Sequence, residues 1–283
     1  MLNTTYEPFA HEAVYVELNR QFLQRLLPHL PPVRCLVDVA CGTGTLSSLL
    51  LSALPQPAGA QGALRLIGVD LSRVSLTLAR RHLTPHAAFP PMQVALLEAS
   101  GDRLPVADAV ADVVLLGNAI HCFADKNALF GEVHRVLRKA GLFAFNSAFY
   151  AGTLVPGTEN FYEIWMKEAL RYLQQRAGGA RPARRRGAAQ PAFANRWFTP
   201  AEYQQALEAC GFEMVSLGER CVGLSRHHFE TVGAYADLAS VLLRGYPVAL
   251  ACEALHQAVG PAFAQAGVQE IPRAWLEVVA RKR

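Results

Sequence analysis

Short apolar runs alternate with helix-like patterns through the first half of the chain. The runs are rich in β-branched and other apolar residues, which is typical of parallel strands buried on both faces. They predict five strands, at residues 33–39, 64–69, 92–97, 110–116 and 142–148. Between them, apolar positions spaced three and four apart predict helices over 45–53, 72–83 and 125–141. Strands that alternate with helices predict an α/β, doubly wound sheet with mostly parallel strands.

Capping residues mark the ends of the predicted helices. Ser72 and Asp125 stand at two helix starts, where a side-chain oxygen can accept hydrogen bonds from free backbone N–H groups. Gly141 is expected to end the helix that Asp125 opens, with Arg138 and Lys139 in its last turn. These residues set the predicted borders between helices and strands.

The alternation of predicted strands and helices stops after the fifth predicted strand. Aromatic residues at helical spacing predict a helix over 158–176, and the Ala/Gly/Pro/Arg-rich residues 177–194 predict a mobile loop. Residues 225–268 are again helical in pattern, with breaks expected near 245–247 and 260–261. These stretches are therefore expected to interrupt the sheet as helical insertions.

The sheet is expected to resume between and after the insertions. A capping box at Thr199, with proline at the first helical position, opens a helix that ends at Gly211. Strands are predicted at 212–219 and 275–280, which brings the sheet to seven strands, and residues 12–27 predict a helix before the first strand. The predicted parts are an N-terminal helical segment (1–31), a Rossmann-like domain (32–148, 197–220 and 272–283) and helical lid or cap insertions (149–196 and 221–271).

Composition excludes several classes of protein. Hydrophobic residues make up 52% and charged residues 18% of the 283, so the chain can bury a sizeable core. Its longest apolar stretch is far short of the ~20 residues that span a bilayer, and its first residues lack a secretory pattern. Six cysteines at irregular spacing, without a CxxC pair, favour neither a zinc site nor a disulfide framework. We therefore expect a cytoplasmic protein with no metal site.

The net charge of +4 comes from one segment. The chain has 27 basic and 23 acidic residues, and four arginines lie in the 177–194 segment with no acid between them: Arg181, Arg184, Arg185 and Arg186. Without these four the chain has 23 basic and 23 acidic residues, so the rest is balanced. A general basic surface for nucleic acid is therefore not indicated. We expect a small-molecule partner, while the sequence leaves open whether the chain is a monomer or a homodimer.

A glycine-containing turn between the first strand and its helix carries the clearest chemistry. Gly42 and Gly44 allow backbone angles that other residues avoid and a close approach of a ligand to the main chain. The helix N-terminus behind them presents free N–H groups. A dinucleotide fingerprint needs a third glycine where Ser47 stands, and Asp38 would repel a pyrophosphate. The same acid suits a ligand that carries an ammonium group.

The order of motifs resembles the class I S-adenosylmethionine-dependent methyltransferases, and within them the small-molecule group that includes quinone and sterol methyltransferases. The resemblance covers residues 6–148, with Ala40 where glycine is more usual. Its motifs are D-x-A-C-G-T-G at 38–44, G-V-D-L-S at 68–72, E-A-S-G-D-R-L-P at 98–105, V-V-L-L-G-N-A-I-H at 113–121 and G-E-V-H-R-V-L-R-K-A-G-L at 131–142. The stretch 6–19 is similar to an N-terminal helical segment of some members.

The resemblance implies S-adenosylmethionine as cofactor and assigns roles to matching positions. Asp70 would hold the ribose hydroxyls and Leu71 would pack on the adenine. Ser100 stands where an aspartate often meets the adenine amino group, so Ser100, the Gly101 backbone or Asp102 would supply that contact. The implied cofactor-binding residues are Tyr15, Asn19, Asp38, Ala40, Gly42, Gly44, Asp70, Leu71, Ser100, Gly101 and Asn118.

The implied reaction is methyl transfer to carbon or oxygen of a small, largely apolar metabolite. An activated methyl leaves the protein to align the acceptor, exclude water and stabilise charge. His121 follows the fourth strand and is the candidate base, with a positioning role as the alternative. The large helical insertions predict a lid over the acceptor. The candidate pocket residues are Tyr150, Phe161, Tyr162, Trp165, Arg196 and His227; for the aromatic ones, packing within a helix face is the alternative.

Other functions remain to be weighed against methyl transfer to a small molecule. An enzyme of the same fold could bind the cofactor and catalyse another reaction, such as a cyclisation. Nucleic-acid methylation is disfavoured, because residues 117–121 read Gly-Asn-Ala-Ile-His rather than the Asn/Asp-Pro-Pro-Tyr/Phe type of amino-methylating families. A binding protein with an inactive site is disfavoured by the intact set of Asp38, Gly42, Gly44 and Asp70.

Overall fold

The chain divides into two compact units. The computed structural model describes residues 2–3, 5–54, 63–85, 92–176 and 196–283, so the predicted loop 177–194 and its four arginines lie outside the described residues. The sheet unit comprises Ala13–Ala151, Trp197–Arg220 and Leu276–Arg283, and the helical unit comprises Met1–Glu12, Gly152–Arg196 and Cys221–Trp275. None of the described helices is both long and apolar enough to span a bilayer.

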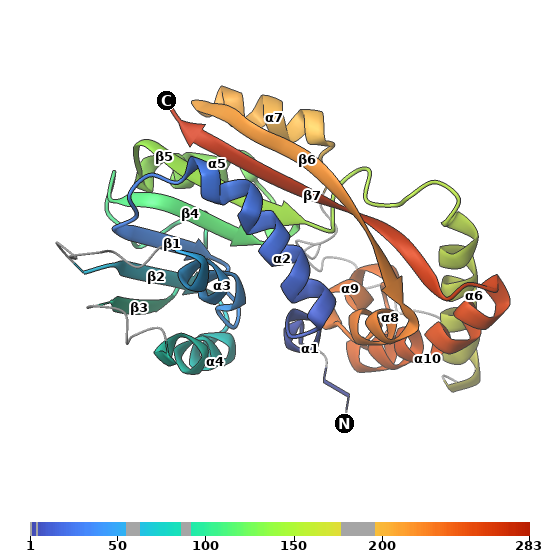
Figure 1. Cartoon of the computed structure of the whole chain (residues 1–283). Helices are drawn as coiled ribbons and strands as arrows, with labels where there is room; N and C mark the ends of the chain where they lie inside the picture. Colours follow the sequence, from blue (N-terminus) through green and yellow to red (C-terminus); the bar gives the residue numbers. More distant parts are fainter. Residues whose placement is uncertain (1, 4, 55–62, 86–91, 177–195) are drawn as a thin grey trace. The chain divides into compact units, whose positions relative to one another are not determined.

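One seven-stranded sheet organises the sheet unit (Figure 1). Its strands are β1 (Cys35–Val39), β2 (Arg65–Asp70), β3 (Gln93–Glu98), β4 (Ala111–Gly117), β5 (Leu137–Ser147), β6 (Phe212–Ser225) and β7 (Glu270–Lys282), in the order β3-β2-β1-β4-β5-β7-β6. The pairs from β3 to β5 are parallel, and β5 pairs with β7 antiparallel. The predicted α/β, seven-stranded, mostly parallel sheet is confirmed. The strand order reverses between β1 and β4, which is where sheets of this kind bind ligands, beyond the carboxyl ends of the strands.

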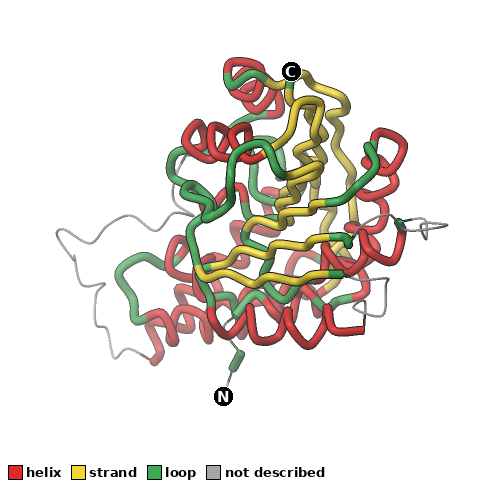
Figure 2. The backbone as a smooth tube through the Cα atoms, turned by 90° about the vertical axis from the view of Figure 1, so that its left-hand side faces the viewer, coloured by secondary structure: helices red, strands yellow, loops and turns green. Residues whose placement is uncertain are grey.

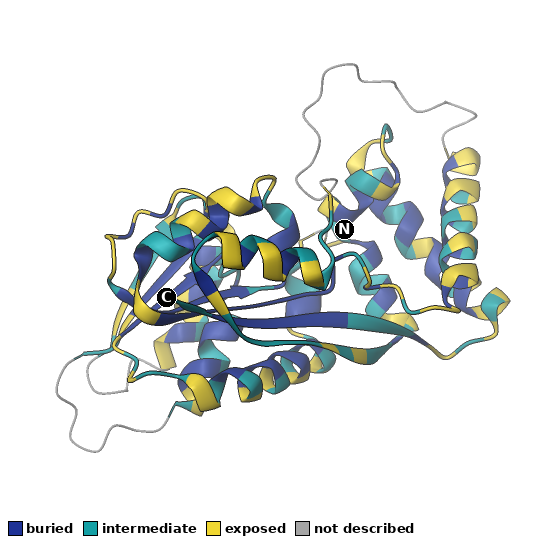
Figure 3. Cartoon of the chain, turned by 90° about the horizontal axis from the view of Figure 1, so that it is seen from above, coloured by how far each residue is buried: buried dark blue, intermediate teal, exposed yellow. Residues whose placement is uncertain are grey.

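Helices cover both faces of this sheet (Figure 2). They are α2 (Ala13–Leu26), α3 (Thr45–Ala53), α4 (Arg73–Leu83), α5 (Lys126–Val136) and α7 (Pro200–Ala209), with short 3-10 turns at Leu27–His29 and Ile120–Cys122. On one face, Phe22 and buried leucines of α2, α3 and α4 share a cluster with Leu36 and Val113 of the sheet. On the other, Phe130 of α5 and Tyr203 of α7 pack on phenylalanines of β5. The central strands β1, β2, β4 and β5 are buried along most of their length (Figure 3).

The predicted helix starts are confirmed by their caps. The Ser72 hydroxyl accepts from the Ser75 N–H at 3.1 Å, and an Asp125 oxygen accepts from two N–H groups of the first turn of α5. Thr199 forms the expected capping box with Glu202. Each cap satisfies backbone donors that have no partner inside the helix.

The end of α5 differs from the prediction. The helix stops at Val136, and β5 begins at Leu137, five residues before the predicted strand. Arg138 and Lys139 therefore lie in the strand rather than in a helical turn, and Arg138 pairs with Asp112 at 2.9 Å. Leu137 pairs with Ala111 in the sheet before the register shifts.

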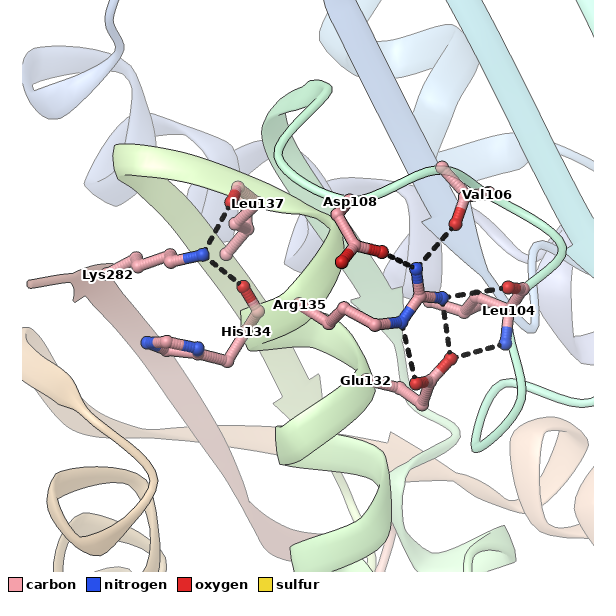
Figure 4. Close-up of polar contacts among 8 residues, drawn as sticks. All are labelled: Leu104, Val106, Asp108, Glu132, His134, Arg135, Leu137 and Lys282. Atoms are coloured by element: carbon pink, nitrogen blue, oxygen red, sulfur yellow. Dashed lines mark hydrogen bonds and ion pairs between the residues drawn. The ribbon is translucent and has the colours of Figure 1, made fainter.

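Side chains from distant segments hold this helix end (Figure 4). The Lys282 ammonium donates to the carbonyl of His134 at 2.6 Å and to that of Leu137 at 2.8 Å. In the same last turn, Arg135 pairs with Glu132 and Asp108 and donates to the carbonyls of Leu104 and Val106. A cation that satisfies terminal carbonyls stabilises a helix end where local sequence alone would continue it.

The helical unit has its own set of helices. They are α1 (Glu7–Ala10), α6 (Glu159–Arg176), α8 (Arg226–Gly233), α9 (Ala236–Leu242) and α10 (Val248–Ala266). The predicted break near 245–247 is confirmed, since Gly245 has φ of +96° and α10 begins after Pro247. The break expected at 260–261 is wrong, because α10 continues through Pro261. Buried Ala258, Val259, Ala262 and Phe263 keep the helix face packed on both sides of the proline, which outweighs the lost backbone hydrogen bond.

The last two strands are longer than predicted. β6 extends to Ser225 and β7 begins at Glu270, so both strands have residues in each unit. Most β6 residues are half-buried rather than alternating between buried and exposed. Without that alternation the sequence of β6 gives only a weak indication of a strand.

Candidate cofactor and acceptor site

The glycine turn at the end of β1 is shaped by left-handed backbone. Ala40, Gly42 and Gly44 have φ of +51°, +53° and +80°, and Gly44 is the N-cap residue of α3. A Cβ atom on Gly42 would meet no atom within 4 Å, so the main chain is open on that side. Gly44 faces Leu83 and Ala79 of α4 instead, at 3.2 Å and 3.4 Å from a Cβ built on it. The turn thus presents main chain at Gly42 and is supported by α4 at Gly44.

Asp38 is a buried carboxyl group with one unsatisfied oxygen. Its side chain is 1% exposed, and Oδ2 accepts from the Ser47 hydroxyl at 2.6 Å. Oδ1 is buried and has no hydrogen-bond partner among the described residues. Burial, together with the negative charge of Asp70, raises the pKa of Asp38 to about 7, against the lowering effect of Ser47. A buried acceptor without a donor fits a cationic donor such as the ammonium group of S-adenosylmethionine.

Asp70 connects the glycine turn to the start of α4. One carboxylate oxygen accepts from the Gly42 N–H and the other from the Ser72 N–H, each at 2.8 Å. Each oxygen keeps a further lone pair, so the carboxylate can also accept from ribose hydroxyls. The next residue, Leu71, is 72% exposed, which leaves an apolar side chain free to pack on a flat ring. These positions fit the roles expected for the ribose and adenine contacts.

Tyr15 of α2 belongs to the same neighbourhood. Its hydroxyl lies 3.8 Å from the position that a Cβ on Gly117 would take. Burial, with a contribution from the charge of Asp38, raises the pKa of Tyr15 to about 12, so the phenol stays protonated. The structure therefore brings Tyr15, Asp38 and the end of β4 together.

Asn19 is engaged by the protein itself. Its amide nitrogen donates to the Tyr15 carbonyl, and its oxygen accepts from the amide of Asn146, both at 2.9 Å. Asn146 also accepts from the Asn118 N–H at 2.8 Å, and Asn118 accepts from the Ala148 N–H at 2.7 Å. This arrangement gives Asn19 a positioning role, because its amide donates one hydrogen bond and accepts another within the protein.

Sequence reasoning missed Asn146. Its signal was an amide directly after the apolar run 142–145 of β5, where a fully buried polar side chain needs hydrogen-bond partners. It holds Asn118 in a left-handed conformation, with φ of +45°. The ends of β4 and β5 and helix α2 are thereby joined by three buried amides.

The loop after β3 leaves the adenine contact open. The Ser100 hydroxyl donates to Asp102 at 2.6 Å, so these two side chains act as a pair. A Cβ on Gly101 would come within 2.4 Å of Val39 and 2.8 Å of Phe123, which explains the glycine by close packing. Ser100, the Gly101 backbone and Asp102 all remain candidates.

His121 lies in an aromatic cluster of the sheet unit. It is 3% exposed, and its ring centroid is 4.3 Å from that of Phe149. Phe149 in turn contacts Trp197 at 6.0 Å. Neither Phe149 nor Trp197 was among the expected pocket residues, because they are far apart in sequence. Tyr150 points its hydroxyl to Glu219 on β6, at 2.5 Å.

Most of the other expected pocket residues belong to the helical unit. Phe161 and Trp165 are buried in its aromatic core against Phe229, with ring centroids 4.9 Å and 5.4 Å away, so packing accounts for both. Tyr162 accepts from Arg273 at 3.2 Å. His227 pairs with Glu12 at 2.8 Å, and Arg196 is exposed; both lie in the same unit.

The described residues contain no group of three or more His, Cys, Asp or Glu side chains that could hold a metal ion. The chemistry described at the ends of β1 and β2 is that of carboxylates and backbone N–H groups, and the aromatic cluster follows β4 and β5.

Comparison with known proteins agrees with this geometry. Residues 37–145 match the family model described as a methyltransferase domain. A demethylmenaquinone methyltransferase of Symbiobacterium thermophilum is 34% identical over 126 residues, which are 44% of this chain and 46% of that protein. A malonyl-[acyl-carrier protein] O-methyltransferase of Methylovorus sp. is 31% identical over 136 residues, 46% of this chain and 43% of that protein. The chain thus matches less than half the length of these curated relatives.

A solved structure shares the fold over nearly the whole chain. The [4+2]-cyclase SpnF superposes with a TM-score of 0.54 at 17% sequence identity, covering 95% of this chain and 81% of that one. At this identity the likeness concerns the fold alone. Together, the fold and the family match define a Rossmann-like methyltransferase domain at residues 37–145. This domain is similar to class I S-adenosylmethionine-dependent methyltransferases that act on small molecules.

Proposed function

We propose that the protein binds S-adenosylmethionine and transfers its methyl group to carbon or oxygen of a small, largely apolar metabolite. The observation that carries this proposal is the unsatisfied, buried Oδ1 of Asp38 beside an open glycine turn. A buried acceptor oxygen without a donor costs free energy, and a ligand ammonium group removes that cost on binding. The relatives described above are named for methylation of demethylmenaquinone and of malonyl-[acyl-carrier protein], so they support the reaction class more than any one acceptor.

The chain supplies binding groups for each part of the cofactor. Asp38 pairs with the ammonium group, Asp70 accepts from the ribose hydroxyls, and Leu71 packs on the adenine. The cofactor, when bound, supplies a methyl group that its sulfonium has already activated. The positive N-terminal end of α3 suits the carboxylate of the cofactor. Tyr15 and the main chain near Asn118 line the methionine part, and Asn19 and Asn146 hold them there.

On the acceptor side, His121 with Phe149 and Trp197 forms an aromatic wall whose polar groups are the imidazole and the indole N–H. The wall excludes water and holds an acceptor, and His121 either orients the acceptor or takes its proton. Tyr162, Arg196 and His227, which lie outside the aromatic core of the helical unit, are the further candidate acceptor contacts. We place the reaction in secondary-metabolite biosynthesis in a reducing, cytoplasmic setting, which the irregular spacing of the six cysteines supports.

Calorimetry with S-adenosylhomocysteine tests the cofactor assignment. Wild type should bind, and Asp70→Ala should weaken binding by about tenfold or more, because it removes an ionised acceptor of hydroxyl hydrogen bonds. Asp237→Ala, at an exposed aspartate of the helical unit, serves as the matched control and should bind as wild type does. A wild-type protein that does not bind would contradict the assignment.

A second candidate is a reaction other than methylation on the same fold, such as a cyclisation. The fold does not separate the two, since a [4+2]-cyclase shares it. Turnover separates them: methyl transfer releases S-adenosylhomocysteine in proportion to product, and a cyclisation leaves S-adenosylmethionine unchanged. Incubation with a panel of phenols, enols and isoprenoid acceptors, followed by mass spectrometry, reads both outcomes.

A further inference from the structure

We propose that His82 is a positioning residue that holds the glycine turn in its binding conformation; this rests on the proposed cofactor site. His82 lies in the last turn of α4, and its Nδ1 is 2.9 Å from the carbonyl oxygen of Thr43. A carbonyl oxygen only accepts hydrogen bonds, so Nδ1 carries the proton and donates. The contact joins a helix to the turn from 39 positions away.

The peptide that His82 contacts is the one most free to rotate. Thr43 stands between Gly42 and Gly44, both with positive φ, and glycine neighbours leave a peptide many alternative orientations. In the structure the peptide between Thr43 and Gly44 is held on both sides. The Gly44 N–H donates to the Cys41 carbonyl at 2.8 Å, and the Thr43 carbonyl accepts from His82. Loss of the imidazole releases one of these two restraints.

The rest of the same helix face supports the turn only by apolar contact. Ala79 and Leu83 lie against Gly44, and both are buried. Residues three and four apart share one helix face, so Ala79, His82 and Leu83 form one supporting surface. His82 gives this surface a directional polar contact, which fixes the orientation of the peptide rather than the distance to the helix.

The same helix is tied to the other end of the candidate site. Its N-cap residue Ser72 donates its backbone N–H to Asp70, and Asp70 accepts from the Gly42 N–H. A closed ring of contacts therefore runs from Gly42 through Asp70 and α4 to His82 and back to Thr43. His82 is the side chain that closes this ring.

Three substitutions separate orientation from packing. In asparagine, Nδ2 is bonded to Cγ as Nδ1 is in histidine, so His82→Asn retains a donor near the required place. His82→Gln moves the donor one bond further, and His82→Leu removes it while keeping apolar bulk. Arg81→Leu, at the exposed neighbour on the same turn, is the matched control.

Two measurements test these variants. Calorimetry gives the Kd for S-adenosylhomocysteine, and amide hydrogen exchange of the segment 40–48 is followed in the ligand-free protein. The leucine and glutamine variants should raise Kd about five- to tenfold, the value of one lost hydrogen bond, with faster exchange in the segment. The asparagine variant and the Arg81 control should stay within about twofold of wild type.

Two results overturn the proposal. One is a leucine variant with wild-type affinity and wild-type exchange in the segment. The other is an asparagine variant as weak as leucine, with a matching loss of thermal stability, which would indicate a packing role. Failure of wild type to bind S-adenosylhomocysteine overturns the cofactor assignment instead. In that case the exchange measurement on the ligand-free protein still decides whether His82 holds the turn.

Discussion

At the scale of single residues, Asp38 shows how a binding site opposes folding. Its pKa is about 7 in the folded protein, mainly because burial disfavours the carboxylate. When folding raises the pKa of a carboxyl group, the free energy of unfolding is lower at a pH where the group is ionised than at a pH where it is protonated. Below about pH 4 the group is neutral in both states, and the stability it then contributes is lost as the pH rises through about 7.

The ionisation of Asp38 predicts a pH dependence of cofactor binding. Only the carboxylate can pair with an ammonium group, so affinity for S-adenosylhomocysteine should rise with pH and level off above about 7. Below that point Kd should change by up to about tenfold per pH unit. Calorimetry across this range measures it, with Asp38→Asn as the control that should give a weak and flat profile. A wild-type profile without a rise toward neutrality would contradict the role of Asp38.

The same carboxyl group predicts a stabilising substitution. Asp38→Asn keeps a partner for Ser47 but removes the cost of a buried charge, so at pH 8 the ligand-free variant should unfold at a higher temperature. The gain in free energy of unfolding is bounded at about 4 kcal/mol by the size of the pKa shift. Thermal unfolding at pH 8 and pH 4 measures it, and the gain should shrink at pH 4, where both proteins are neutral at this position. An equal difference at both pH values would show that charge is not the cause.

At the scale of elements, three buried amides join α2 to the ends of β4 and β5. The amides of Asn19 and Asn146 each donate one hydrogen bond and accept another, and the amide oxygen of Asn118 accepts one. These bonds fix the orientation of each amide. Buried polar groups of this kind specify one arrangement of the packed elements, because any other leaves donors unsatisfied. The helix that carries Tyr15 is thereby fixed relative to the sheet.

This network predicts a large effect of a nearly isosteric substitution. Asn146→Leu leaves the Asn19 oxygen and a backbone N–H without this partner, and should lower the free energy of unfolding by about 2–4 kcal/mol. Adding Asn19→Leu should cost less than the sum of the two single variants, because it removes the group left unpaired. Denaturant unfolding measures the cycle, with exposed Asn127→Leu as a control that should change stability little. Additive effects would argue against a connected network.

At the scale of the whole molecule, each unit has a core of its own. The core of the sheet unit is aliphatic on one face and aromatic on the other, whereas Phe161, Trp165, Phe229 and Phe263 fill the helical unit. The candidate cofactor residues from Tyr15 to Asn118 all lie in the sheet unit. Cofactor binding and the stability of the helical unit should therefore respond to different substitutions.

Phe229 offers the test of this separation. Phe229→Ala empties the centre of the aromatic core, and truncation of a buried phenylalanine costs about 3–5 kcal/mol. Hydrogen exchange should rise in α6, α8 and α10, while calorimetry should give a wild-type Kd for S-adenosylhomocysteine. Leu36→Ala in β1 is the matched control, which should loosen the sheet unit and weaken binding. A Phe229→Ala variant with weakened binding would show that the two units are energetically coupled.

Much of the fold followed from local patterns in the sequence. Strands β1 to β4 lie within a residue or two of their predicted bounds, because each is a short apolar run between turn residues. The early start of β5 and the continuous α10 did not follow, since Lys282 and the packing around Pro261 decide them. Periodicity in the sequence predicts which face of an element is buried. It does not predict contacts with segments that are distant in the sequence.

The sequence by itself determined the order of strands and helices along the chain, the left-handed turn around Gly42, and the two acids at the ends of β1 and β2. These depend on residue type and near neighbours. Only the tertiary structure decided that Asp38 keeps an unsatisfied oxygen, that Asn146 holds Asn118, and that His82 reaches the glycine turn. Those facts depend on burial and on hydrogen-bond geometry between residues far apart in the chain, which exist only once the chain has packed.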